Sequence, residues 1–502
     1  MNYKSINYQQ LHIVSSLSQL YHSYVITCPI SAYSDEYETN HYCSTYNALL
    51  IELKNNPVYF HISFRSPSEV KIPTLPETNW GPTKNVKEST EIRPFKIDVP
   101  QSVIDDLKYR LEKRRPFVEP LEGEAWNYGI NTKYLNTVLD YWKDKYNWTE
   151  RQKLLNKYPQ FKTNIQGLDI HFYHVKPSNL PKNKNIKVLP LMIVHGWPGS
   201  VVEFQKLIPM LTTPSPKYDF VFELIIPSLP GYGFSDGAVR PGMGAAQIAV
   251  IFKNLMQRLG FNKYYVQGGD WGAVVTSNLA ALYPEKVIGL HSNMCGAFTP
   301  STFFWLLVGS YFPSVVVEKE HYSQFFPIST VLKRLVQETG YLHLQATKPD
   351  TIGAALTSSP DALAAYILEK FSIWVNKSYN SRDDGGLLEK LTLDELLDNV
   401  MMYWVTNSFT TSARLYSENF NIAYRALKVE EIPIQVPTAC ATFPNELLTQ
   451  PQSLLKHRYA NLIQYNYMPR GGHFAAFEEP QLLAEDIFVF VKNLKEMEKK
   501  ST

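Results

Sequence analysis

The sequence predicts an α/β protein with a mostly parallel sheet, and three observations lead to this prediction. From Val188 onward, short apolar runs with strand character alternate with amphipathic helical stretches. Several of these runs end in glycine-containing turns, as expected where a strand passes directly into a helix. The chain has 502 residues, of which 44% are hydrophobic and 19% charged, so it can bury a large core and hold several structural regions.

The expected core elements follow one another in a regular order. Strands are predicted at Leu191–Val194, Phe220–Ile226 and Tyr264–Val266. A helix is predicted over residues 248–259, where apolar residues recur with helical spacing until Gly260. Another is predicted over residues 273–283, before Pro284. Strand character returns near Thr442, and an amphipathic helix closes the chain.

We divide the chain into five regions. They are a poorly defined N-terminal segment (1–70), an N-terminal region with helical stretches (71–185), the first part of the α/β core (186–299), a helical lid inserted into it (300–428), and the second part of the core (429–502). In the second region, Ser102 with Asp105 three residues later predicts a capped helix start.

Composition excludes several classes of function. The net charge is +2, and no basic run indicates a nucleic-acid partner. The four cysteines, at positions 28, 43, 295 and 440, show neither the spacing of a metal site nor a disulfide framework, so buried free thiols are expected. No secretory signal and no convincing membrane span is recognised in the sequence.

Asp270 is the candidate nucleophile. It stands in Gly268-Gly-Asp-Trp-Gly272, between a predicted strand and a predicted helix. A turn of this kind pushes its central side chain out above the sheet, at the N-terminus of the helix, and commonly carries serine. A carboxylate there suits displacement of a leaving group from saturated carbon, which forms an ester that water then cleaves.

A glycine-rich loop after the first core strand, His195-Gly-Trp-Pro-Gly-Ser200, is the candidate oxyanion hole. In this arrangement one backbone N–H comes from such a loop and one from the residue after the nucleophile. We therefore assign the two donors to Trp197 and Trp271.

His473 is the candidate general base, because it follows two glycines after the last predicted core strand. The order nucleophile, acid, histidine along the chain fits Asp270 and His473 as first and last members. An imidazole titrates near neutrality and can draw a proton from water. Glu446, after the preceding strand, is favoured as its acid partner, while Glu478 and Glu479 remain alternatives.

Longer stretches of the sequence resemble the microsomal-type epoxide hydrolases, including the juvenile hormone epoxide hydrolases of insects. The resemblance runs from about residue 73 to residue 497 and includes both glycine-rich loops. Further matching stretches are Asn79-Trp-Gly-Pro82, Ile92-Arg-Pro-Phe95, Tyr158–Thr163, Gly167–His171, Gly340–Asp350 and Gly471–Pro480.

This resemblance implies an α/β-hydrolase fold with a helical lid and an N-terminal epoxide-hydrolase extension. It also implies that Tyr341 and Tyr416 donate hydrogen bonds to the epoxide oxygen, and it supports Glu446 as the acid. An apolar epoxide and water are the expected partners, juvenile hormone epoxide the favoured substrate and foreign epoxides the alternative. No cofactor and no metal are expected.

Members of the resembled family usually begin with a hydrophobic anchor, which this sequence does not show clearly. Attachment to the endoplasmic reticulum is therefore implied by the resemblance alone, with peripheral membrane association as an alternative. Two other functions stay open. A dehalogenase could use the same Asp-Trp pair, although halide needs no proton donor to leave. A catalytically silent binder of a hydrophobic ligand would have no use for the complete set of reactive groups.

Overall fold

The computed structural model describes residues 48–53, 56–61, 72–82, 88–178, 180 and 186–501. The chain forms two compact units, Met1–Phe64 and Arg65–Thr502. In the first unit, β1 (Ala48–Leu53) and β2 (Asn56–His61) pair antiparallel. The rest of the segment predicted as poorly defined, residues 1–70, lies outside the described residues.

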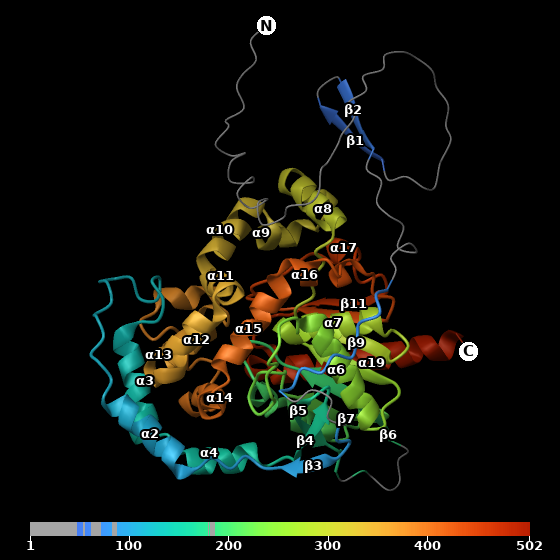
Figure 1. The fold of residues 1–502 in the computed structure, drawn as a ribbon. Coiled ribbons are helices and arrows are strands. Elements are labelled where there is room, and N and C mark those ends of the chain that lie inside the picture. Colours follow the sequence, from blue (N-terminus) through green and yellow to red (C-terminus); the bar gives the residue numbers. More distant parts are fainter. Residues whose placement is uncertain are drawn as a thin grey trace, which may run out of the picture. The chain divides into compact units, whose positions relative to one another are not determined.

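The second unit is built on a mixed sheet, with nine strands among its described residues, in the order β11-β10-β9-β8-β6-β7-β5-β4-β3 (Figure 1). The strands are β3 (Ile92–Phe95), β4 (Gln160–Ile165), β5 (Leu168–Val175), β6 (Lys187–Val194), β7 (Phe220–Pro227), β8 (Tyr264–Gly268), β9 (Val287–Ser292), β10 (Thr438–Thr442) and β11 (Leu462–Tyr467). In the part of the sheet that extends from β11 through β6 to β7, all neighbouring strands run parallel, as the strand-helix alternation predicts.

Helices of the core lie between these parallel strands in the sequence or follow the last of them. They are η2 (Val201–Phe204), α5 (Leu207–Thr212), α6 (Ala245–Arg258), α7 (Asp270–Leu282), η6 (Val429–Glu431), α17 (Gln452–Leu455), α18 (Ala475–Glu478) and α19 (Pro480–Ser501). Helix α6 packs beside α7, and α5 packs beside α19. Apolar residues of α6 at helical spacing, among them Ile248, Ile251 and Leu255, are fully buried. The predicted α/β fold is confirmed.

The N-terminal extension contains strands as well as helices. Its helices are α2 (Gln101–Glu112), α3 (Thr132–Asp144) and α4 (Trp148–Leu155). Strands β3, β4 and β5 add an antiparallel edge to the sheet, which the helical patterns in the sequence did not indicate. The predicted cap at Ser102 is wrong: α2 begins one residue earlier, after Pro100, without a side-chain cap.

Helices dominate the insertion between β9 and β10. They are α8 (Pro300–Tyr311), η3 (Pro313–Val315), η4 (Lys319–His321), α9 (Tyr322–Phe325), α10 (Ile328–Glu338), α11 (Gly340–Thr347), α12 (Pro349–Ser358), α13 (Pro360–Ile373), η5 (Lys377–Ser381), α14 (Leu393–Thr406), α15 (Phe409–Phe420) and α16 (Ile422–Arg425). Both α11 and α12 pack against α15 (Figure 1). Within the described ranges, no helix combines the length and the apolar character needed to cross a membrane.

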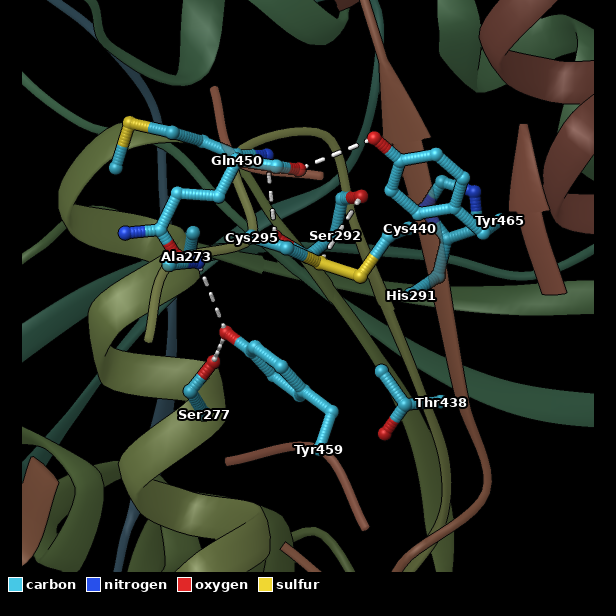
Figure 2. The surroundings of a disulfide bond; sticks show 12 residues. Ala273, Ser277, His291, Ser292, Cys295, Thr438, Cys440, Gln450, Tyr459 and Tyr465 are labelled. Carbon is cyan, nitrogen blue, oxygen red and sulfur yellow. Dashed lines mark hydrogen bonds between the residues drawn. A yellow bond between two sulfur atoms is a disulfide. The ribbon is translucent and has the colours of Figure 1, made fainter. Parts of the chain in front are cut away.

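The prediction of free thiols is wrong for two of the four cysteines. Cys295 and Cys440 form a disulfide between the segment after β9 and the middle of β10 (Figure 2). Their Cα atoms are 5.9 Å apart, because β9 and β10 are neighbouring parallel strands. A pairing across 145 residues of sequence depends on strand order, which cysteine spacing alone does not reveal. Cys28 and Cys43 lie outside the described residues.

Candidate active site

Asp270 lies at the point where β8 turns into α7, and it adopts a left-handed backbone conformation with φ of +49°. Such a conformation is costly for a residue with a side chain, and it is typical of functional turns. Close packing explains the flanking glycines. A Cβ on Gly268 would lie 2.3 Å from the carbonyl oxygen of Gly272, and one on Gly272 would lie 2.0 Å from that of Val194. The turn therefore holds the Asp270 carboxylate at the carboxyl end of the parallel strands.

The loop after β6 receives one oxygen of this carboxylate. The Trp197 backbone N–H donates a hydrogen bond of 2.7 Å to Asp270 Oδ1. Gly196 makes this approach possible, since a Cβ there would lie 2.1 Å from the same oxygen. Trp271 follows Asp270 in the first turn of α7, where backbone N–H groups have no partner within the helix. Its assignment as the second oxyanion donor stays a prediction.

Contacts from the core and the lid fix the shape of this loop. The buried His195 ring donates from Nδ1 to the Gly196 carbonyl oxygen at 3.0 Å and accepts the Leu229 N–H at Nε2 at 3.1 Å. Burial lowers the pKa of His195 to about 4, so its ring is neutral. From helix α14, Asn399 and Tyr403 donate to the carbonyl oxygens of Pro198 and Gly199.

His473 lies between two carboxylates. Its Nδ1 is 2.8 Å from Glu446 Oε1, and its Nε2 is 3.4 Å from Asp270 Oδ2. The alternative acids have other partners. Glu478 accepts the N–H groups of Gly472 and Phe474, on either side of the histidine. Glu479 pairs with Lys390 and Arg470. Among the three acids, the structure thus places Glu446 against the imidazole.

The two carboxylates control the protonation of His473. Burial lowers the pKa of the ring, but the negative charges of Glu446 and Asp270, with the hydrogen bonds they accept, raise it well above its ordinary value. The imidazole is therefore positively charged while Asp270 is ionised. If a bond to carbon neutralises Asp270, one cause of the raised pKa disappears and the ring can act as a base.

Two tyrosines from the lid pack on the rings of Trp197 and Trp271, the two residues assigned as oxyanion donors. Tyr341, on α11, stacks on the Trp197 ring with centroids 4.9 Å apart, and Tyr416, on α15, meets the Trp271 ring edge to face at 4.9 Å. The two phenol rings are themselves 5.8 Å apart. Burial raises the pKa of both phenols well above the ordinary value, so each keeps its proton and can donate it in a hydrogen bond. The structure therefore brings together the residues predicted from separate motifs.

This arrangement can carry out a two-step displacement. The charge of the Asp270 carboxylate acts on two neutral acids, and the carboxylate itself accepts a backbone N–H and lies beside a histidine. Two family models match the chain: "Epoxide hydrolase N terminus" over residues 92–204 and "alpha/beta hydrolase fold" over residues 190–316. Juvenile hormone epoxide hydrolase 1 of Ctenocephalides felis is 54% identical over 88% of this chain and 93% of its own length.

The chain belongs to the epoxide hydrolases. Epoxide hydrolase 1 of Sus scrofa is 46% identical over 82% of this chain and 91% of its own length. Among solved structures, the crystal structure of juvenile hormone epoxide hydrolase from the silkworm Bombyx mori superposes with a TM-score of 0.82 at 49% identity. It covers 84% of this chain and 99% of that one. The fold and family expected from the sequence are confirmed.

Sequence reasoning missed two polar residues that lie beside the reactive groups. Glu203, on η2, and Asn293, just after β9, line the same small cavity as Asp270 and His473. Glu203 could have been noticed, because it is an acidic residue within the apolar run Val201–Phe204. Such a residue is expected to be buried, and a buried carboxyl near a reactive group is a candidate for function. Asn293 carries no comparable signal.

Proposed function

We propose that the protein converts apolar epoxides into vicinal diols through a covalent ester on Asp270, and that its substrate is a juvenile hormone epoxide. The observation that supports this proposal is the Asp270 carboxylate 3.4 Å from His473 Nε2, with its charge acting on both lid tyrosines. Oδ1 already accepts the Trp197 N–H, so Oδ2 is the oxygen that attacks.

In the first step, Asp270 Oδ2 forms a bond to an epoxide carbon while the carbon–oxygen bond of the ring breaks. An alkoxide is a poor leaving group, and a proton donor lowers this barrier. Tyr341 and Tyr416 donate hydrogen bonds to the epoxide oxygen, and one of them supplies the proton. Their raised pKa values keep both phenols protonated at neutral pH. The tyrosinate that remains takes up the proton that His473 releases once Asp270 has lost its charge.

In the second step, water attacks the carboxyl carbon of the Asp270 ester. His473 takes a proton from that water, and Glu446 stabilises the resulting imidazolium at 2.8 Å. The developing negative charge on Oδ1 is held by the N–H groups of Trp197 and Trp271. The ester bond then breaks, and the diol leaves with a proton from His473. The remaining carboxyl proton passes to His473, which restores the Asp270 carboxylate and the imidazolium.

The substrate proposal is supported by the relatives and by the apolar walls of the site. Proteins named juvenile hormone epoxide hydrolase reach 54% identity to this chain, while Epoxide hydrolase 1 of Sus scrofa reaches 46%. Around the nucleophile, aromatic rings such as those of Trp197, Trp271 and Trp374 offer contacts to an apolar chain rather than to a polar one. A dehalogenase would not need the two phenols.

We propose that the protein works at a membrane surface, because its apolar substrate partitions into lipid. Helix α8 offers exposed apolar side chains for such a contact: Leu307 is 57% exposed and Tyr311 81% exposed. The test is flotation of the full chain with phosphatidylcholine vesicles. We expect wild type to float and Leu307→Glu to float less, whereas wild type that stays with the free protein would contradict this location.

The activity is tested by measuring kcat/KM for juvenile hormone and for styrene oxide, with Asp270→Asn as the inactive control. We expect diol from both epoxides, with a higher kcat/KM for juvenile hormone. Equal or lower values for the hormone would indicate a general epoxide hydrolase. Binding without any diol would support the silent-binder alternative.

A further inference from the structure

A small cavity lies beside Asp270 and His473. Its volume is about 20 Å³, enough for an ordered water molecule. Its polar side chains include those of Glu203, Asp270, Asn293 and His473. Neither lid tyrosine is among the described residues that line it. The cavity therefore touches the proposed nucleophile and base, Asp270 and His473, and is not lined by the two tyrosines proposed to bind the epoxide oxygen.

The loop after β6, residues 195–200, leaves space for the Glu203 carboxyl in the same way as it does for the Asp270 carboxylate. A Cβ on Gly199 would lie 1.6 Å from Glu203 Oε1, just as a Cβ on Gly196 would lie 2.1 Å from Asp270 Oδ1. Because Gly196 and Gly199 have no side chains, the loop leaves space for two carboxyl groups. That of Asp270 lies beside the Trp197 N–H, and that of Glu203 lies beside the cavity.

Glu203 is buried, and no ion pair to it is found in the part of the chain that the structure describes. Burial raises the pKa of its carboxyl to about 8, although the charge of His473 opposes the rise. Near pH 7 the group is therefore mainly neutral. A neutral carboxyl can both donate and accept a hydrogen bond, which suits it to hold a water molecule.

Asn293 provides a second polar group on the same cavity. The Gln267 amide donates to its Oδ1 at 2.8 Å, which fixes the orientation of the side chain. Its Nδ2 lies near Gly269, where a Cβ would be 2.6 Å from it. A water in the cavity can thus find polar partners on Glu203, Asn293 and His473, as an ordered buried water requires.

We propose that Glu203 is a positioning residue that holds the hydrolytic water in this cavity, between His473 Nε2 and the Asp270 ester. This inference rests on the proposed function and assigns a water site for its second step. The water oxygen forms the bond to the Asp270 carboxyl carbon, and its proton passes to His473 Nε2. Glu203 gains and loses no proton overall. It orients the water and has no part in forming the ester.

The experiment is single-turnover kinetics with juvenile hormone, following formation and decay of the Asp270 ester by quenched-flow mass spectrometry. In Glu203→Leu we expect ester decay to slow by about 10-fold or more, as for loss of a buried hydrogen bond, while ester formation stays within about 3-fold of wild type. Glu203→Gln, which keeps a donor and an acceptor, is expected to restore decay to within about 3-fold.

Two further variants keep the test decisive. Glu223→Leu is the matched control, because Glu223 lies on β7, bonds His174 Nε2 at 2.6 Å and does not line the cavity. It should leave both steps unchanged. If Glu203→Leu does not fold, Gly199→Ala displaces the same carboxyl and should slow decay selectively.

Unchanged ester decay in folded Glu203→Leu, or equal slowing of both steps, would overturn the water-positioning role. Absence of any ester, even in His473→Gln, would instead contradict the proposed function itself. The two failures are therefore distinguishable in the same assay.

Discussion

At the scale of single residues, the two oxygens of Asp270 have different surroundings. Oδ1 is held by the Trp197 N–H at 2.7 Å, whereas Oδ2 is 3.4 Å from His473 Nε2. The carboxylate is thus oriented before substrate arrives, which is the condition for rapid attack at carbon. In the proposed mechanism, formation of the ester removes the Asp270 charge and thereby converts His473 from an acid into a base.

The tyrosine pair is expected to act in the first step only. Replacing Tyr341 or Tyr416 by Phe should slow ester formation by about 100-fold through loss of a proton donor, and replacing both should abolish it. Tyr366→Phe is the matched control, since its ring also packs on Trp197, at 5.8 Å. Stopped-flow measurement of the first step checks this. A single variant with wild-type ester formation would exclude that tyrosine as a donor.

The raised pKa of Glu203 predicts that the stability of the protein depends on pH. Its pKa is raised from 4.5 to about 8 in the folded chain, so between these pH values the unfolded chain releases a proton that the folded chain keeps. The free energy of unfolding therefore falls as pH rises through this range. In Glu203→Gln this contribution is absent, and thermal unfolding should depend less steeply on pH from 5 to 8. An unchanged slope would show that Glu203 ionises normally.

At the scale of elements, a buried ion pair connects the N-terminal extension to the lid. Arg151, on α4, binds both carboxylate oxygens of Asp398 on α14, and the Tyr146 hydroxyl donates to the same carboxylate at 2.8 Å. Burial raises the pKa of Asp398, although these two partners oppose the rise. Asn399 of α14 also donates a hydrogen bond to the Pro198 carbonyl oxygen in the loop after β6, so the extension supports the site indirectly.

Removing only the cation of this pair should be costly. Arg151→Met leaves the buried Asp398 without a cation and is expected to lower the free energy of unfolding by about 3–5 kcal/mol. The double variant Arg151→Met/Asp398→Leu should lose less, because no uncompensated charge remains. Chemical denaturation measures both values. A double variant less stable than Arg151→Met would contradict this explanation.

The parallel part of the sheet could be predicted from sequence, because β6 and β7 are largely apolar runs followed by glycine- or proline-rich turns. The antiparallel edge formed by β4 and β5 could not be predicted from the sequence. Gln160–Ile165 mixes buried and partly buried polar residues, so its alternation is weak. Likewise, Tyr341 and Tyr416 could be chosen among 32 tyrosines only by family resemblance, since packing of α11 on α15 brings them together.

At the scale of the whole molecule, the disulfide closes the loop that contains the lid. Cys295 and Cys440 are 145 residues apart, and residues 300–428 lie between them. Figure 2 shows the bond among side chains from β9, β10 and the following segments. A cross-link over so long a loop restricts the unfolded chain and stabilises the folded one.

The double variant Cys295→Ala/Cys440→Ala is expected to lower the free energy of unfolding by about 2–4 kcal/mol. A reducing agent should destabilise wild type similarly and leave the double variant unaffected. Denaturation with and without dithiothreitol provides the comparison. If reductant has no effect on wild type, or destabilises the double variant equally, the bond does not stabilise the protein.

We propose that catalysis passes through an ester on Asp270, and single-turnover mass spectrometry detects this ester. His473→Gln and wild type are mixed briefly with juvenile hormone, quenched and digested. We expect an adduct of substrate mass on the peptide that carries Asp270, accumulating in the variant because ester hydrolysis is slowed. A folded variant that forms no adduct with juvenile hormone or styrene oxide would contradict it, as would an adduct on another residue.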